Sequence, residues 1–120
     1  MTKREEILKV LNDLLKLDDV LACMVAKKGL EGIVPSKIKV KNVDLWVLLV
    51  KTTDRLFDLI DQFYDYGNTR ATFEIGKYVV ITEPISRNNS LIVVIPELAN
   101  RGLLNLEIEN TKRKIKKIIS

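Results

Sequence analysis

The sequence predicts a single α+β domain whose elements follow the order helix, two strands, helix, three strands, helix. Two observations predict this class. Apolar residues recur at helical spacing at both ends and in the middle of the chain, and short apolar or alternating runs bounded by turn residues lie between them. The 120 residues suffice for one core, and no linker, repeat or low-complexity tract divides them. Residues 1–120 are therefore expected to form one domain.

The first helix is predicted to begin at a capping box. Thr2 and Glu5 have the spacing at which each side chain satisfies the other's free backbone amide. The apolar residues that then recur at helical spacing are Ile7, Leu11 and Leu14. Asp18 and Asp19 end this pattern, so the helix is expected to end before them.

Two strands are predicted to follow this helix. Residues 20–26 are apolar without alternation, which is typical of a strand covered on both faces. Residues 30–34 return after a glycine turn at 28–29 and complete a hairpin, and the lysine-rich residues 35–42 lead to the next helix. Cys23 lies in the first of these strands without a basic neighbour, so we interpret it as a buried apolar residue rather than a nucleophile.

Residues 43–66 predict a long amphipathic helix that ends near Gly67. Its first two turns break the amphipathic pattern, because residues 45–50 are apolar all round and Val47 and Leu48 lie on the stripe that is polar further along. A helix that is apolar on every side must be covered on every side. The sheet of so small a domain covers one side only, so the other side needs a further partner.

The segment 71–75 is predicted to be an edge strand. Its apolar and polar residues alternate, which is typical of a strand with one face exposed. Glu74 within it and Lys77 after it are charges of the kind that protect sheet edges from unwanted pairing. Gly76 and Lys77 are suited to a type II′ turn, which joins this strand to the next.

Two apolar strands at 78–82 and 91–95, separated by Pro84 and a polar loop at 86–90, precede a last helix at 103–119. Basic residues crowd that helix: Lys112, Arg113, Lys114, Lys116 and Lys117. Such a cluster is able to contact phosphates or anionic lipid. The simpler interpretation is that acidic residues early in the helix and basic residues late in it complement the helix dipole, and the mild net charge of +4 favours this interpretation.

No segment predicts secretion or a membrane span. The longest apolar runs fall far short of the roughly 20 residues that a bilayer requires. Glu5 and Glu6 stand where a signal peptide would begin its apolar stretch. A single cysteine cannot form an internal disulfide, which fits a reducing compartment. The chain is therefore expected to be cytoplasmic.

The sequence shows no motif or grouping of residues that is typical of catalysis. The sequence contains no histidine, the commonest general base and metal ligand. Gly76-Lys77 resembles the end of a phosphate-binding loop, but Ala71 stands where that loop needs its first glycine, and Tyr78 replaces the serine or threonine that would hold magnesium. We therefore predict a protein that is not an enzyme, with no catalytic residue, cofactor or metal. An enzyme that uses only carboxylates, lysines and tyrosines is the alternative.

Four aspartates are expected on one side of the central helix, because they are spaced four, three and four residues apart: Asp54, Asp58, Asp61 and Asp65. They form either a solvated face, partly offset by Lys51 and Arg55, or a docking stripe for a basic partner. A magnesium or calcium site is the weakest interpretation, because ligands for hard cations usually wrap around the ion from a loop.

Three stretches of the chain resemble the Roadblock/dynein light-chain family. Residues 19–29 resemble the opening strand and glycine turn of that family, and residues 43–67 are similar to its long central helix. Residues 98–107 resemble the passage into its final helix, with an Asn-x-Gly-Leu pattern. The resemblance extends from about Glu5 to Ile119 and involves no catalytic motif.

The resemblance implies a five-stranded antiparallel sheet with the long central helix on one face and the two terminal helices on the other. It also implies a homodimer in which the central helices of two subunits pack together and the middle strands pair edge to edge. The residues implied in the helix contact are Leu45, Trp46, Leu49, Val50 and Thr53. The residues implied in the strand contact are Arg70, Thr72, Phe73 and Glu74.

The function implied by the resemblance is that of a non-catalytic homodimeric adaptor or regulator, which binds a small Ras-like GTPase or a signalling or motor complex. The four aspartates would dock that partner. If the protein stimulates hydrolysis, Arg87 in the polar loop is the arginine placed to supply a charge in trans. Two alternatives stay open: a small-ligand sensor, and a basic nucleic-acid or membrane-surface binder that uses the C-terminal helix. Our leading hypothesis includes neither nucleic acid nor a membrane span.

Overall fold

The computed structural model describes residues 1–28, 30–67 and 69–120. Within its helices and strands it describes every side chain except those at positions 30, 31, 50, 53, 54, 56 and 57.

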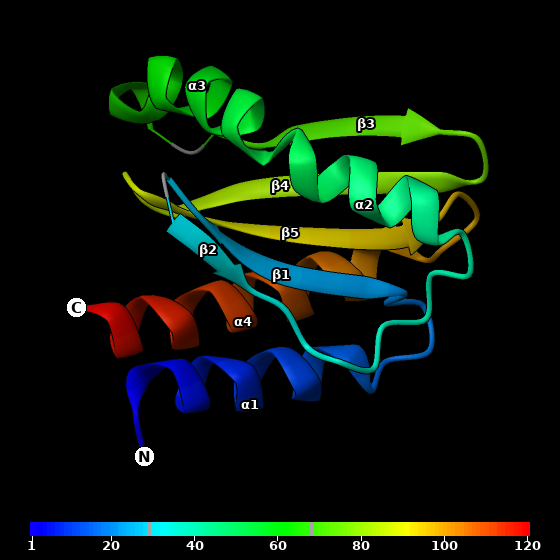
Figure 1. Ribbon diagram of the computed structural model, residues 1–120, viewed down its shortest axis with the longest axis horizontal. Coiled ribbons are helices and arrows are strands. Elements are labelled where there is room, and N and C mark those ends of the chain that lie inside the picture. Colours follow the sequence, from blue (N-terminus) through cyan, green and yellow to red (C-terminus); the bar gives the residue numbers. More distant parts are fainter. Residues whose placement is uncertain (29, 68) are drawn as a thin grey trace.

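A five-stranded sheet forms the centre of the molecule (Figure 1). Its strands are β1 (Ala22–Lys27), β2 (Leu30–Ile33), β3 (Ala71–Ile75), β4 (Tyr78–Ser86) and β5 (Asn89–Pro96). They lie in the order β2-β1-β5-β4-β3, and every neighbouring pair is antiparallel. The strands β2 and β3 therefore form the two edges, as predicted for residues 71–75.

Helices cover both faces of the sheet (Figure 1). On one face α1 (Lys3–Leu15) and α4 (Arg101–Ile119) lie side by side. On the other face lie α2 (Val43–Lys51), α3 (Thr53–Phe63) and the short 3₁₀ helix η1 (Tyr64–Tyr66). The predicted fold class and the predicted division of the helices between the two faces are thus confirmed.

The terminal helices bury a continuous apolar stripe against the sheet. Leu11 and Ile108 are fully buried between the helices and strands β1, β4 and β5. Each helix has a capped start: Thr2 Oγ1 accepts a hydrogen bond from the Glu5 amide (3.1 Å), and Asn100 Oδ1 accepts one from the Gly102 amide (3.2 Å). The threonine half of the predicted capping box is therefore present.

The opposite face is covered by α2 and by the connection that precedes it. Trp46 and Leu49 of α2 pack on Met24, Val80 and other residues of the central strands. Val40, in the lysine-rich connection, is buried in the same cluster. Side chains thus fill both faces of the sheet.

The central helix differs from the prediction, because it is two helices joined at Thr52 rather than one helix over 43–66. Thr52 Oγ1 donates a hydrogen bond to the Leu49 carbonyl (3.0 Å), and the Arg55 amide bonds the Thr52 carbonyl (3.1 Å), three residues back instead of four. A threonine hydroxyl that bonds the preceding turn competes with the regular helical pattern and bends the helix. The segment ends at Gly67, as predicted, with a positive φ of 109° that favours glycine.

The hairpin of β4 and β5 is also longer than predicted. The strands continue to Ser86 and from Asn89, so the predicted polar loop at 86–90 is a tight turn at Arg87 and Asn88. Pro84 lies inside β4, where the register shifts between Pro84 and Ser86. A proline is tolerated at such an irregularity, because the ladder bond that it cannot donate is already interrupted there. Arg87 consequently stands on a tight turn and not in a long loop.

Truncating the core between α4 and the sheet is expected to destabilise the protein strongly. Ile108→Ala should lower the free energy of unfolding by about 2–5 kcal/mol, because it removes buried contacts and leaves a cavity. Leu106→Ala on the same helix is the matched control, since Leu106 is 65% exposed, and it should change this energy by less than about 0.5 kcal/mol. Urea unfolding curves of both variants measure the difference. Equal losses would contradict the orientation of α4.

Candidate association surface

The edge strand β3 leaves one side of its backbone available for pairing. Within the described sheet it pairs only with β4. Thr72 and Glu74 are exposed on one face of this strand, whereas Phe73 and Ile75 are half-buried against the α2 side of the sheet. An open edge strand presents unpaired N–H and C=O groups, which are a template for pairing with another strand.

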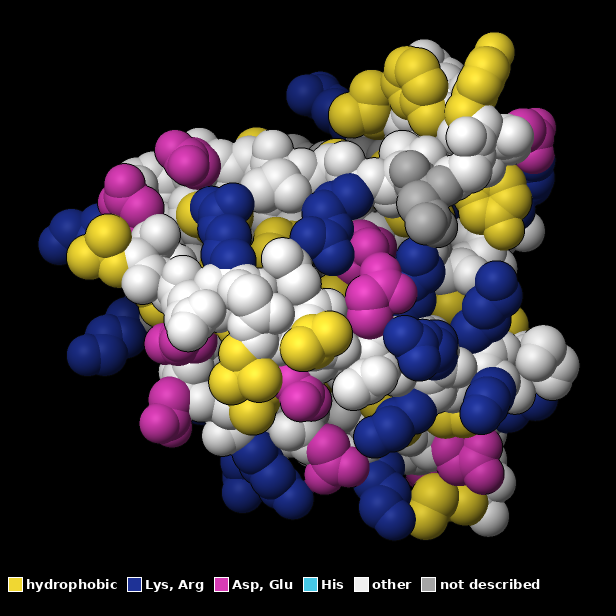
Figure 2. All heavy atoms as spheres, turned by 180° about the vertical axis from the view of Figure 1, so that it is seen from behind, with side chains coloured by type: hydrophobic (Ala, Val, Ile, Leu, Met, Phe, Trp, Pro, Cys, Tyr) yellow, Lys and Arg dark blue, Asp and Glu magenta, His cyan; other side chains and the backbone are white. Residues whose placement is uncertain are grey.

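Exposed apolar side chains continue from this edge over α2, α3 and η1. They are Val43, Val47, Leu48, Leu59, Phe63 and Tyr66. Leu48 on α2 is 56% exposed and Phe63 at the end of α3 is 50% exposed, and exposed apolar side chains that gather on a surface are typical of an interaction site. Figure 2 shows hydrophobic side chains protruding from the end of the molecule where α3 lies. We call the outer side of α2 and α3 together with β3 the α2–β3 surface.

A groove of about 410 Å³ separates α3 from the edge strand. Leu59, Ile60 and Phe63 form its helical wall, and the segment 69–73 forms the other wall. Most of this lining is apolar. The groove links the exposed helix residues to β3, so helix and strand belong to one surface.

Two of the residues predicted for the helix contact, Trp46 and Leu49, face the sheet and not a partner helix. Trp46 (9% exposed) and Leu49 (5% exposed) lie in the protomer's own core, and Leu45 is half-buried beside them. Val47 and Leu48 are the side chains of these turns that face outward. The side chains of Val50 and Thr53, also predicted for this contact, lie outside the described residues.

The residues predicted for the strand contact all lie on or next to β3. Arg70 holds β3 to its neighbours: its Nη2 forms an ion pair with Glu83 Oε2 of β4 (3.1 Å), and its Nη1 donates to Asn105 Oδ1 of α4 (2.9 Å). Thr72 and Glu74 remain exposed, and Phe73 lines the groove. The Arg70 contacts could not be predicted from the sequence, because they join residues far apart in the chain.

Two of the four aspartates predicted to share one side of the central helix, Asp61 and Asp65, are bound by Arg87. Arg87 Nη1 donates to Asp61 Oδ1 (3.0 Å) and Nη2 to Asp65 Oδ1 (2.6 Å). The same guanidinium lies over the ring of Tyr64, 4.9 Å from its centre. Arg87 is therefore held within the protomer and is not the unengaged arginine that the sequence suggested. Asp58 is exposed, and the side chain of Asp54 lies outside the described residues.

Cys23 is fully buried, its Sγ donates to the Leu11 carbonyl (3.4 Å), and burial raises the pKa of its thiol from 9.0 to about 12. The prediction that Cys23 is buried is thus confirmed. Across the described part of the chain, no three histidine, cysteine or acidic side chains are grouped so that they could hold a metal ion. Nor does that part contain a helix both long and apolar enough to cross a bilayer.

The strand order and the two helical layers define the class of domain: this is the Roadblock/LC7 fold. The chain is similar to MglB of Myxococcus xanthus, with a TM-score of 0.76 and 18% identity over 97% of this chain and 89% of that one. It is also similar to a Roadblock/LC7 domain from Streptomyces avermitilis, with a TM-score of 0.67 and 13% identity over 92% of this chain and 95% of that one.

A third similar structure is described as "MglB with tetrameric arrangement", with a TM-score of 0.66 and 15% identity over 98% of this chain and 90% of that one. No protein-family model and no curated protein matches the sequence. The likeness is therefore one of structure, and it establishes the fold. The resemblance to the Roadblock family seen in the sequence is confirmed at this level.

The Cys23 thiol is expected to resist alkylation in the native protein. Because its pKa is raised to about 12, the reactive thiolate is scarce at neutral pH, and the sulfur is also shielded from solvent. Iodoacetamide at neutral pH should label native Cys23 at least about 100-fold more slowly than the thiol of the unfolded chain. Mass spectrometry of labelling time courses with and without guanidinium measures both rates. Similar rates in the two states would contradict the buried placement.

Proposed function

We propose that the protein is a non-catalytic homodimeric adaptor or regulator in the cytoplasm that binds a small Ras-like GTPase or another signalling or motor complex. The observation that carries this proposal is the α2–β3 surface, which joins an open strand edge to exposed apolar helix residues. The shared fold with MglB and Roadblock/LC7 domains supports it, and the similar structure with a tetrameric arrangement shows that a protein of this fold assembles.

In the proposed dimer a two-fold axis passes next to β3. A strand that meets its own copy across such an axis pairs with it antiparallel, and the two α2 helices then lie close together. With Thr72 on the axis, Arg70 of one protomer faces Glu74 of the other, so opposite charges meet at the edge. Val47 and Leu48, which the sequence left without a covering partner, become buried between the helices.

The partner is proposed to dock beside this helix pair. Of the aspartates, Asp58 is the described residue that is exposed and makes no ion pair, so it is the first candidate for a basic partner surface. Asp61 and Asp65, which accept hydrogen bonds from Arg87, would belong to the same docking surface together with Arg87 and Tyr64. Asp54 stays a candidate from its position on the same helix.

Leu48→Asp is expected to convert the dimer into a monomer, because it places a charge in the proposed apolar contact without touching the protomer core. Leu106→Asp is the matched control, since it changes another exposed leucine, which lies on α4, across the sheet from α2. Light scattering coupled to size exclusion gives the mass of each variant, and circular dichroism confirms that both are folded. A folded Leu48→Asp protein of unchanged mass would contradict the proposed dimer.

Asp58→Lys is expected to weaken binding of a GTPase partner at least about tenfold, because it reverses a charge at the proposed docking face. Asp18→Lys, an exposed aspartate on the loop after α1, is the matched control. The assay captures Ras-like GTPases from the source organism's lysate on the immobilised protein, with a GTP analogue or GDP present. Nucleotide-dependent capture that Asp58→Lys reduces and Asp18→Lys preserves is the expected result. Absence of any Ras-like GTPase in both nucleotide states would overturn the GTPase part of the proposal.

A further inference from the structure

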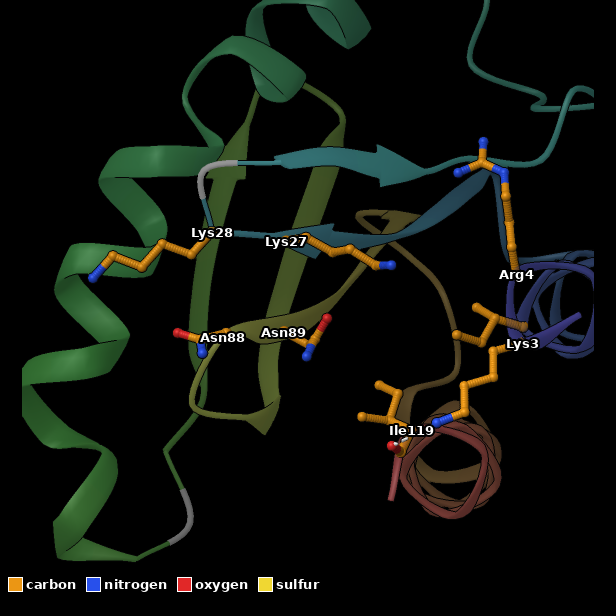
Figure 3. Close-up of a pocket in the computed structure, with 8 residues that line it drawn as sticks. Lys3, Arg4, Lys27, Lys28, Asn88, Asn89 and Ile119 are labelled. Atoms are coloured by element: carbon orange, nitrogen blue, oxygen red, sulfur yellow. Dashed lines mark hydrogen bonds between the residues drawn. The ribbon is translucent and has the colours of Figure 1, made fainter.

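A basic pocket lies away from the α2–β3 surface, where the start of α1, the end of β1, the β4–β5 turn and the end of α4 meet (Figure 3). Its volume is about 540 Å³. The polar residues that line it are Lys3, Arg4, Lys27, Lys28, Asn88 and Asn89. Ile7 and Ile119 supply the rest of the described lining, and none of the described lining side chains is a carboxylate.

The cations come from two elements that face each other across the pocket. Figure 3 shows Lys27 extending from β1 toward the first turn of α1, where Lys3 and Arg4 lie, whereas Lys28 and Asn88 point outward at the rim. Figure 2 shows that basic side chains gather at the same end of the molecule. Charges from separate elements thus line one hollow.

Hydrogen bonds and strand pairing connect the elements that line this pocket. Lys27 is the cross-strand partner of Asn89 in the β1–β5 ladder, and the Lys28 amide donates to the Asn88 carbonyl (3.0 Å). Lys3 Nζ donates to the Ile119 carbonyl (3.4 Å), which ties α1 to the end of α4. Asn89 Nδ2 donates to Ser86 Oγ (2.8 Å) within the turn. The geometry of the pocket therefore rests on the sheet and on the helix pair.

No ion pair among the described side chains balances the charges of the pocket. Lys16, Arg70 and Arg87 each form an ion pair with an acidic side chain, but none of the four pocket cations does so in the described structure. Lys3 and Arg4 also stand at the positive end of the α1 dipole, where a basic residue is unfavourable. Neither helix stability nor internal pairing accounts for this cluster, whereas an anion would relieve its repulsion.

We propose that this pocket binds the di- or triphosphate group of a small molecule. Arg4 offers the planar guanidinium that pairs with two phosphate oxygens at once, and Lys27 offers a point charge on the opposite side. The volume lies in the range of small-molecule sites. This site is separate from the α2–β3 surface and does not depend on the function proposed above.

The test is a calorimetric titration of the full chain with inorganic triphosphate and, separately, with magnesium-free ATP, in 150 mM salt at neutral pH. The expected result is saturable binding with one site per protomer. Arg4→Glu and Lys27→Glu should each weaken it at least about tenfold, because each removes a charge-assisted contact and adds a repulsive charge. Lys9→Glu is the control, since it makes the same charge change at an exposed position of α1 outside the pocket lining.

The two titrants identify the source of the phosphate group. Equal affinities indicate that the phosphate chain alone is recognised, and tighter binding of ATP indicates a nucleotide ligand. Absence of saturable binding, or an equal loss in Lys9→Glu, would overturn the proposal, because the second result reveals only diffuse attraction by net charge. Sedimentation with phosphatidylserine vesicles is run in parallel. Vesicle binding without triphosphate binding would also overturn the proposal and assign the cluster to a membrane surface.

Discussion

The sheet has two apolar faces, and the rest of the molecule is arranged to cover them. Val25 and Val93 point to the face under α1 and α4, whereas Met24 and Val94 point to the face under α2. Strands of this kind must be shielded on both sides from water. The terminal helices shield one side as a packed pair. On the other side α2 and the connection before it complete the cover, so α2 has the sheet beneath it and solvent above it.

That position explains why α2 is apolar all round. Trp46 and Leu49 are buried in the core. Val47 and Leu48 face outward on the side of the sheet whose edge strand, β3, pairs within the described sheet with β4 alone. The break at Thr52 separates α2 from α3. The helix α3 forms a groove with β3, and Asp61 in its last turn accepts a hydrogen bond from Arg87 of the β4–β5 turn. Core packing and the proposed self-association therefore depend on opposite sides of the same short helix.

Part of this arrangement could be predicted from local pattern in the sequence, and part from resemblance. The edge strand follows from alternation at 71–75 and the burial of Cys23 from its apolar strand. The five-stranded sheet and the division of the helices between its faces came from the resemblance to the Roadblock family. The inward side of α2 could not be predicted, since a helix that is apolar all round does not indicate which side meets the sheet. The Arg87 contacts with Asp61 and Asp65 and the basic pocket were also missed, because they join residues distant in the chain whose meeting depends on the length of the β4–β5 hairpin.

Backbone hydrogen exchange at the two sheet edges tests the central claim, that β3 is a pairing edge, most directly. The protein is compared at concentrations where light scattering gives a dimer and, after dilution, a monomer, with the opposite edge strand β2 as the internal reference. The account predicts that amides of residues 71–75 exchange more slowly in the dimer, whereas those of β2 exchange at the same rate in both states. Unchanged exchange in 71–75, or new protection in β2, would contradict it.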